Sequence, residues 1–180
     1  ALVEQEQEEE LGQEGQALSD EESPVLTHLR AWLTSEGKPF RELQHAPTRT
    51  SEESAAARGE PLSNGGKALL LKVDDAFGLF VLPADRRLDS RAIRDELGTR
   101  RTRFASAEEL CELAGLVPGG VPPFGEPILP FPLHLDAQIP RNERIAFNAG
   151  SLEHSFIMSV EAYLSVAEPA RIFGFSKAPD

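Results

Sequence analysis

The stretch KALLLKV at residues 67–73 is followed by the turn residues Asp74-Asp75 and then by GLFVL at residues 78–82. The first run is almost entirely apolar, which is typical of a strand buried on both faces of a sheet. Asp and Gly between two such runs favour a tight turn. The pattern therefore predicts a β-hairpin.

Signals for short helices and further strands flank this hairpin. Helix starts are predicted at Ser23-Pro24, Thr50 with Glu53, Asp89, Ser106 with Glu109, and Ser159. Further strands are predicted at residues 40–45, 102–105, 133–135, 144–148, 155–158 and 171–175. Residues 116–132 hold six prolines and three glycines and predict a long irregular loop, which in a compact domain is usually functional. Because several strands follow one another directly, we expect an α/β domain with a mixed, partly antiparallel sheet.

The length and the charge of the chain set its organisation. The 180 residues are 40% apolar and 27% charged, a composition typical of one globular domain, with no apolar run near the roughly 20 residues of a membrane span. The net charge is −12, but residues 1–23 hold nine carboxylates and no Lys or Arg, which leaves 21 acidic against 18 basic residues elsewhere. We therefore expect an acidic disordered tail or linker at residues 1–23, a folded domain at 24–178, and no membrane partner.

Seven of the 14 arginines fall between Arg86 and Arg103, with three acidic residues among them and a fourth, Asp85, directly before Arg86. Such a stretch is consistent with a surface that contacts phosphates, with Arg100, Arg101 and Arg103 as its densest part. It is also consistent with a solvated helix face held by local ion pairs, and charge alone favours this second interpretation.

Few residue patterns point to metal, cofactor or nucleophile chemistry. No two of the four histidines have metal-ligand spacing, and one cysteine cannot complete a zinc site, so we expect no metal and no cofactor. Ser151 and His154 lack the flanking glycines of a nucleophile elbow, and we interpret their proximity as chance. Cys111 shares a helix face with Leu110 and is predicted to be buried and structural.

Lys67 opens an apolar strand directly after Asn64-Gly65-Gly66, which puts its ammonium group at the rim of the sheet. There it is either an anion ligand or a lysine that extends to solvent. Gly119-Gly120 and Gly150 allow a ligand to approach the backbone N–H groups closely, although plain turn geometry also explains them.

Several motifs appear in order along the chain: His45-Ala46-Pro47-Thr48, GKALLLKV at 66–73, VLPAD at 81–85, GGVPPFG at 119–125 and AFNAGS at 146–151. Together they resemble the YbaK/prolyl-tRNA-synthetase-associated domain family, over about residues 24–176. One difference is Pro122, which stands where many members have Ser or Thr, at a position that borders the amino-acid pocket.

The resemblance implies a single α/β domain that hydrolyses the ester of tRNA mischarged with a small amino acid (Ala, Ser or Thr). It implies a cytoplasmic protein that acts in trans or as the editing domain of a synthetase, with tRNA as its partner. By the same resemblance Lys67 is the catalytic residue, and the substrate-binding residues are His45, Thr48, Gly119, Gly120, Pro122, Asn148, Gly150 and Ser151. The alternative is a non-catalytic module on the same fold that binds tRNA or a synthetase through the arginines.

Overall fold

The computed structural model describes residues 22–179, so all but the last two residues of the predicted acidic tail lie outside the described part. The predicted hairpin is present: β2 (Gly66–Val73) and β3 (Ala76–Pro83) are antiparallel, and Lys67 pairs with Leu82. Asp74 takes a positive φ of 51° in the turn between them, a conformation that Asp tolerates better than most residues. The central hairpin of the prediction is thereby confirmed.

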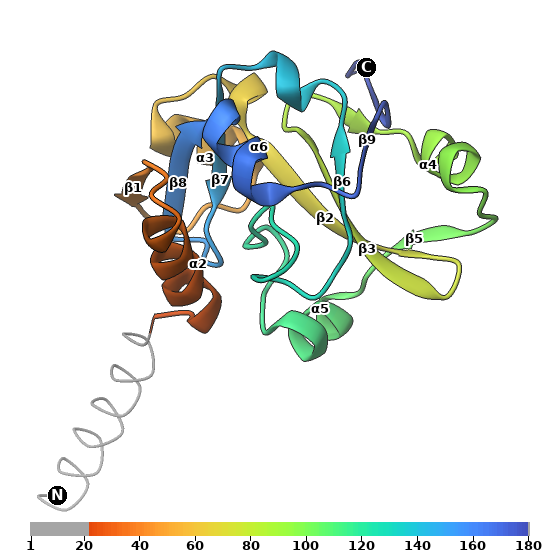
Figure 1. Cartoon of the computed structure of the whole chain (residues 1–180), viewed down its shortest axis with the longest axis horizontal. Helices are drawn as coiled ribbons and strands as arrows, with labels where there is room; N and C mark the ends of the chain where they lie inside the picture. The colour runs from red at the N-terminus through yellow and green to blue at the C-terminus, as the bar shows by residue number, and fades with distance from the viewer. Residues whose placement is uncertain (1–21, 180) are drawn as a thin grey trace, which may run out of the picture.

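The hairpin is the middle of a five-stranded sheet with the order β5-β2-β3-β6-β9 (Figure 1). The other strands are β5 (Thr102–Phe104), β6 (Leu133–Asp136) and β9 (Arg171–Phe173). The pairs on the β5 side are antiparallel, whereas β3 with β6 and β6 with β9 are parallel. The mixed, partly antiparallel sheet is confirmed.

A second, antiparallel sheet has the order β1-β8-β7, and it was not predicted as a separate layer. Its strands are β1 (Arg41–Gln44), β7 (Arg144–Asn148) and β8 (His154–Ser159). A single bridge between Gly65 and Ala146 joins β7 to the residue just before β2. The short strands β4 (Arg87–Leu88) and β10 (Ser176–Lys177) pair separately. The start of β2 therefore lies where the two larger sheets meet.

Five α-helices in the described residues surround the sheets. They are α2 (Pro24–Ser35), α3 (Ser51–Arg58), α4 (Ser90–Leu97), α5 (Ala107–Ala114) and α6 (Val160–Ala167), with 3₁₀ turns η1 (Leu62–Asn64) and η2 (Ile139–Arg141). The predicted caps Thr50, Asp89, Ser106 and Ser159 each accept a hydrogen bond from a backbone N–H of the first turn. Ser23 differs, because its side chain makes no cap bond. No helix within residues 22–179 has the length and apolar character needed to cross a bilayer.

The predicted irregular loop 116–132 forms no helix or strand, and yet it contributes to the core. Phe124 is fully buried and makes edge-to-face contacts with Trp32, Phe147 and Tyr163. The Tyr163 hydroxyl donates to the carbonyl of Pro123. Aromatic packing therefore fixes a segment that carries no regular backbone hydrogen-bond ladder.

The prediction for Cys111 is wrong, because this cysteine is exposed. Helix α5 buries Leu110 alone, with 6% of that side chain exposed. A helix turns by about 100° per residue, so the residue after Leu110 already points away from the core.

Candidate functional site

A cleft of about 200 Å³ opens where α3, the start of β2 and the 119–121 segment meet. It is lined by Thr48, Arg49, Thr50, Ser51, Ser54, Arg58, Gly65, Gly66, Lys67, Ala68, Leu69, Ala84, Gly119, Val121 and Asn148. Its three ionisable residues are all cations, Arg49, Arg58 and Lys67, and none of its lining residues is a carboxylate. In a chain with a net charge of −12, this cleft is locally basic.

Lys67 is half-buried in the cleft wall and is the second residue of β2. Its Nζ donates to the main-chain oxygen of Arg86 at 3.3 Å. Burial lowers the pKa of Lys67, while the charges of Glu52 and Asp85 act in the opposite direction. Gly66 packs so closely on β7 that a Cβ there would lie 2.7 Å from Ile145 Cδ1, which explains a glycine before the lysine.

Arg58 ends α3 and is buried, with 8% of the residue exposed. Its Nε donates to Ser155 Oγ at 2.9 Å, and its Nη2 donates to Asn148 Oδ1 at 3.0 Å. Burial lowers its pKa to about 10, which leaves the guanidinium charged at neutral pH. The ion pairs found between described residues do not include Arg58.

Asn148 joins this arginine to the glycine loop, because its Nδ2 donates to the carbonyl of Gly119 at 2.8 Å. Gly119 has a φ of 86°, a conformation that suits glycine, whereas the Gly120 N–H donates to the carbonyl of Val117 at 3.0 Å. The Gly120 N–H, one of those expected to face a ligand, is therefore used inside the loop.

His45 does not line the cleft but contacts it indirectly, through Ser155. Its Nε2 lies 2.8 Å from Ser155 Oγ, and its Nδ1 lies 2.8 Å from the carbonyl of Ala46. Thr48 is on the wall itself, buried, and its Oγ1 accepts a hydrogen bond from Ser54 Oγ at 2.8 Å. The His45–Thr48 element thus supports the cleft from two positions.

The structure brings together four of the predicted site residues on the cleft wall, namely Thr48, Lys67, Gly119 and Asn148. The others, His45, Gly120, Pro122, Gly150 and Ser151, do not line it. Pro122 is buried, and Gly150 packs against α2, where a Cβ would lie 3.0 Å from the Leu26 nitrogen. Arg58 was missed, because an arginine at the end of a short helix usually faces solvent and no local pattern marks it as buried.

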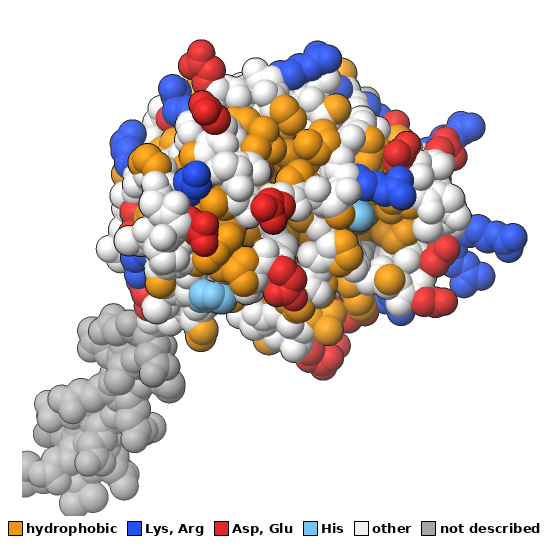
Figure 2. Space-filling view, viewed as in Figure 1, with side chains coloured by type: hydrophobic (Ala, Val, Ile, Leu, Met, Phe, Trp, Pro, Cys, Tyr) orange, Lys and Arg blue, Asp and Glu red, His pale blue; other side chains and the backbone are white. Residues whose placement is uncertain are grey.

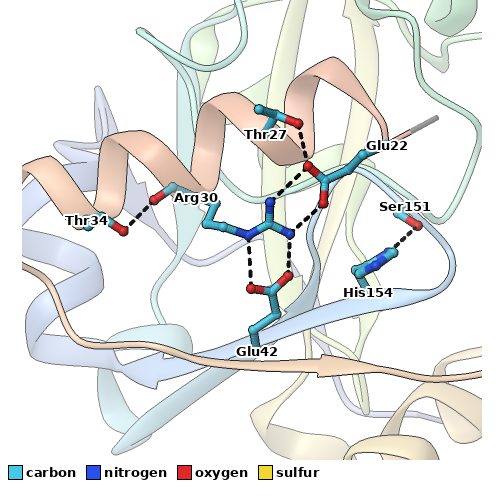
Figure 3. A network of polar contacts seen from close by, with 7 residues as sticks. All are labelled: Glu22, Thr27, Arg30, Thr34, Glu42, Ser151 and His154. Atoms are coloured by element: carbon cyan, nitrogen blue, oxygen red, sulfur yellow. Dashed lines mark hydrogen bonds and ion pairs between the residues drawn. The ribbon is translucent and has the colours of Figure 1, made fainter. Parts of the chain in front are cut away.

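Ser151 and His154, which were not expected to form a nucleophile with its base, are in hydrogen-bond contact. The Ser151 Oγ lies 3.1 Å from His154 Nδ1 and also accepts from the Glu153 N–H, as a tight turn brings them together (Figure 3). The pair lies beside α2 and is not part of the cleft wall.

The predicted arginine surface lies at the other end of β2. Lys72, which pairs with Arg103, is five residues from Lys67, or about 17 Å along a strand. The backbone N–H groups of Arg100 and Arg101 donate to Asp74 Oδ1, and Arg103 Nη1 forms an ion pair with Glu109 at 2.7 Å. Basic and acidic side chains are mixed at this end of the molecule, over α4 and β5 (Figure 2).

No group of three or more His, Cys, Asp or Glu side chains in the described part of the chain is arranged to hold a metal ion. The candidate site is therefore the basic cleft lined by Arg49, Arg58 and Lys67.

Comparison with known proteins gives consistent matches. Residues 45–166 match the aminoacyl-tRNA editing domain family. The chain is 36% identical over 154 residues to the multifunctional Ser/Thr-tRNA deacylase ProXp-y of Escherichia coli K12, an alignment that covers 80% of this chain and 90% of that protein.

Two further similarities are to proteins whose names refer to the charging of tRNA with proline. The chain is 33% identical over 109 residues to the proline–tRNA ligase of Shouchella clausii, covering 61% of this chain but 19% of the ligase. A solved structure described as a candidate trans-editing enzyme for prolyl-tRNA synthetase superposes with a TM-score of 0.74 at 26% identity, covering 88% of this chain and all of that one.

Proposed function

The chain belongs to the aminoacyl-tRNA editing domain family, and from this premise we propose that it hydrolyses the ester of tRNA mischarged with a small amino acid, Ala, Ser or Thr. The mischarged tRNA is its partner, and the cytoplasm, where translation takes place, is its site of action. An aminoacyl-tRNA synthetase is a second partner in this proposal, because sequence similarity extends to proline–tRNA ligases.

The observation that supports this proposal best is the charge of the cleft. Arg49, Arg58 and Lys67 line it without a carboxylate, in a chain whose overall charge would repel nucleic acid. A concave site lined by one sign of charge concentrates the field and attracts the opposite sign. The 3′ end of tRNA brings phosphates and an ester whose carbonyl oxygen becomes negative during hydrolysis.

Direct attack by water fits the side chains of the cleft. Within residues 22–179, none of the hydroxyls that line the cleft is hydrogen-bonded to a histidine or a carboxylate: Thr48 accepts from Ser54, and Thr50 accepts from the Glu53 N–H. A hydroxyl without such a base is a weak nucleophile. An aminoacyl ester is labile, so positioning the carbonyl and a water accounts for the reaction without an acyl-enzyme.

In this mechanism Lys67 supplies the charge at the reacting carbonyl. Its ammonium is partly removed from water, which strengthens its interaction with a developing oxyanion. Asn148 holds the Gly119 carbonyl and so fixes the loop that closes the other side of the cleft.

The size of the cleft favours small amino acids. A volume of about 200 Å³ is below the range of roughly 300–1,000 Å³ that is usual for pockets of drug-sized ligands. Exclusion by size is effective where attraction is not, because one methylene group in a pocket is worth only about 1–3 kcal/mol.

The test is a deacylation assay with tRNA charged with Ala, Ser, Thr or Pro, measured against spontaneous ester hydrolysis. We expect the protein to deacylate at least one of the tRNAs that carry Ala, Ser or Thr. We expect no turnover of a tRNA that is correctly charged with a bulkier amino acid. Binding of these tRNAs without turnover would instead identify a non-catalytic tRNA-binding module and would contradict the proposal.

A further inference from the structure

We propose that Arg58 is a positioning residue of the deacylase, which orients Asn148 and through it the Gly119 loop in the cleft. The proposal rests on the proposed function, since it assigns a role within that reaction. Arg58 is distant in sequence from Asn148 and is not part of any of the motifs identified in the sequence.

Three hydrogen bonds define the position of the Arg58 guanidinium. Besides those to Ser155 Oγ and Asn148 Oδ1, its Nη1 lies 3.5 Å from the carbonyl of Ala146. All three acceptors belong to β7 or β8, whereas Arg58 belongs to α3. The planar fork of the guanidinium therefore fastens this helix to the second sheet at the wall of the cleft.

The contact with Asn148 sets which way its amide points. A side-chain amide has an accepting oxygen and a donating nitrogen, and the two ends are almost equal in shape. Arg58 Nη2 requires the oxygen on its side, which turns Nδ2 toward the Gly119 carbonyl at 2.8 Å. Without the cation, Asn148 Oδ1 loses its donor from α3, so the amide and the Gly119 carbonyl that it holds are fixed less firmly.

Ser155 does not replace Arg58 in this role. Its hydroxyl has one hydrogen and two neighbouring acceptors, His45 Nε2 at 2.8 Å and Asn148 Oδ1 at 3.2 Å. The His45 Nδ1 faces the carbonyl of Ala46, so in a neutral imidazole Nε2 is the accepting nitrogen and takes the Ser155 hydrogen. In that state Arg58 is the donor to Asn148 Oδ1 in the network.

The burial of the Arg58 charge is costly in free energy without a countercharge. A buried charge needs a partner charge, and the ion pairs between described residues do not include this guanidinium. Glu60, whose charge acts on Arg58 from a distance, is itself hydrogen-bonded to Asn64 and Arg144. An anionic substrate in the cleft supplies the missing countercharge.

The experiment compares Arg58→Lys and Arg58→Ala with the wild type on a tRNA that the wild type deacylates. Lysine keeps the charge but lacks the planar fork whose three nitrogens reach Ser155, Asn148 and Ala146 in fixed directions. We therefore expect kcat to fall about a hundredfold with a small change in KM, as misplacement by about 1 Å produces. We expect guanidinium ion, at concentrations far below those that unfold proteins, to restore part of the kcat of Arg58→Ala.

Hydrogen exchange of residues 116–125 gives a readout that does not depend on activity, and it should become faster in both variants. The matched control is Arg144→Ala, which removes an exposed arginine of β7 that pairs with Glu60 at 3.2 Å. It should keep the wild-type kcat and exchange, and its activity should not respond to guanidinium.

The outcomes separate the two proposals. A wild type that deacylates no tRNA overturns the proposed function. An active wild type whose Arg58→Lys variant keeps its kcat, or whose loop exchange is unchanged in Arg58→Ala, overturns the role of Arg58 alone. Equal losses of kcat in Arg58→Ala with and without guanidinium, in a variant that retains the wild-type circular dichroism, also contradict it.

Discussion

The Nζ of Lys67 donates a hydrogen bond to the main-chain oxygen of Arg86, 3.3 Å away across the rim of the sheet. A neutral carbonyl orients the ammonium without cancelling its charge. Lys67 takes part in none of the ion pairs found between described residues, so its charge is directed to whatever enters the cleft.

We therefore predict that Lys67→Ala lowers kcat for a mischarged tRNA by about 100- to 1,000-fold, the usual loss when one donor to an oxyanion is removed. The fold should be retained, because the residue lies half-exposed at the start of β2. The measurement is single-turnover deacylation together with thermal unfolding.

Lys72→Ala is the matched control for Lys67. It removes a lysine from the same strand, one whose Nζ lies 5.7 Å from the centre of the Phe77 ring and outside the cleft. It should deacylate at the wild-type rate. Wild-type turnover by Lys67→Ala would exclude the lysine from the chemistry.

The parts of this fold that were predictable from sequence are those that local patterns determine. The hairpin depends on two apolar runs around Asp74-Asp75, and the caps at Thr50 and Ser106 depend on contacts three residues apart. The position of Lys67 at the cleft follows from its place at the mouth of a strand. Each of these inferences needs only neighbouring residues.

The parts that were not predictable depend on contacts between distant segments. Arg58 is buried only because α3 lies against Asn148 and Ser155, which are 90 and 97 residues away in sequence. Cys111 shows the reverse case: a short helix with one apolar stripe does not reveal how little of the stripe the core covers.

His134 is expected to make stability depend on pH. Its ring is buried edge-to-face against Phe80, its Nδ1 has no partner in the described residues, and burial lowers its pKa from 6.5 to about 4. The unfolded chain binds this proton at about pH 6.5 and the folded chain only near pH 4, so stability falls as the pH drops through that interval. The loss is up to about 3 kcal/mol.

Urea unfolding of the wild type and of His134→Leu, at about pH 7 and about pH 4, measures this effect. The variant should lose less free energy of unfolding between the two pH values, whatever its absolute stability. Parallel losses in the two proteins would show that another group carries the acid sensitivity.

Ser151→Ala should keep most of the deacylase activity. Although Ser151 Oγ lies 3.1 Å from His154 Nδ1, the serine does not line the cleft, and so the pair has no substrate to attack. Cys111→Ala should behave in the same way, because Cys111 is exposed on α5. Mass spectrometry of the enzyme during turnover should show no acyl adduct, and an adduct on either residue would establish a covalent mechanism instead.

Deletion of residues 1–21 should leave catalysis unchanged and slightly strengthen tRNA binding at low salt. It removes eight carboxylates and no basic residue, and salt screens such repulsion beyond about 8–10 Å. Glu22 should be kept, because its carboxylate binds Thr27 and Arg30 at the start of α2 (Figure 3). Loss of turnover on this deletion would show that the acidic segment belongs to the catalytic machinery.

The surface formed by Arg100, Arg101 and Arg103 has a lower net positive charge than its sequence indicates. Arg103 is exposed and forms two hydrogen bonds with the Glu109 carboxylate, which offsets its charge. Arg100 and Arg101 are exposed, and their backbone is held by Asp74. If this end of the molecule contacts tRNA, Arg100 and Arg101 are the residues that supply phosphate contacts.

We predict that the double variant Arg100→Ala and Arg101→Ala weakens binding of full-length tRNA. The slope of log affinity against log salt concentration should become less steep by the amount that about two phosphate contacts contribute, whereas Arg103→Ala should have a smaller effect. Both variants should hydrolyse an aminoacylated CCA fragment at the wild-type rate. A fragment bound in the cleft should not depend on these arginines, which lie about 17 Å or more from Lys67 in the direction of β2. Affinity measured over a series of salt concentrations tests this. A slope identical to that of the wild type would make the surface a solvated face with local ion pairs, and tRNA would then dock elsewhere.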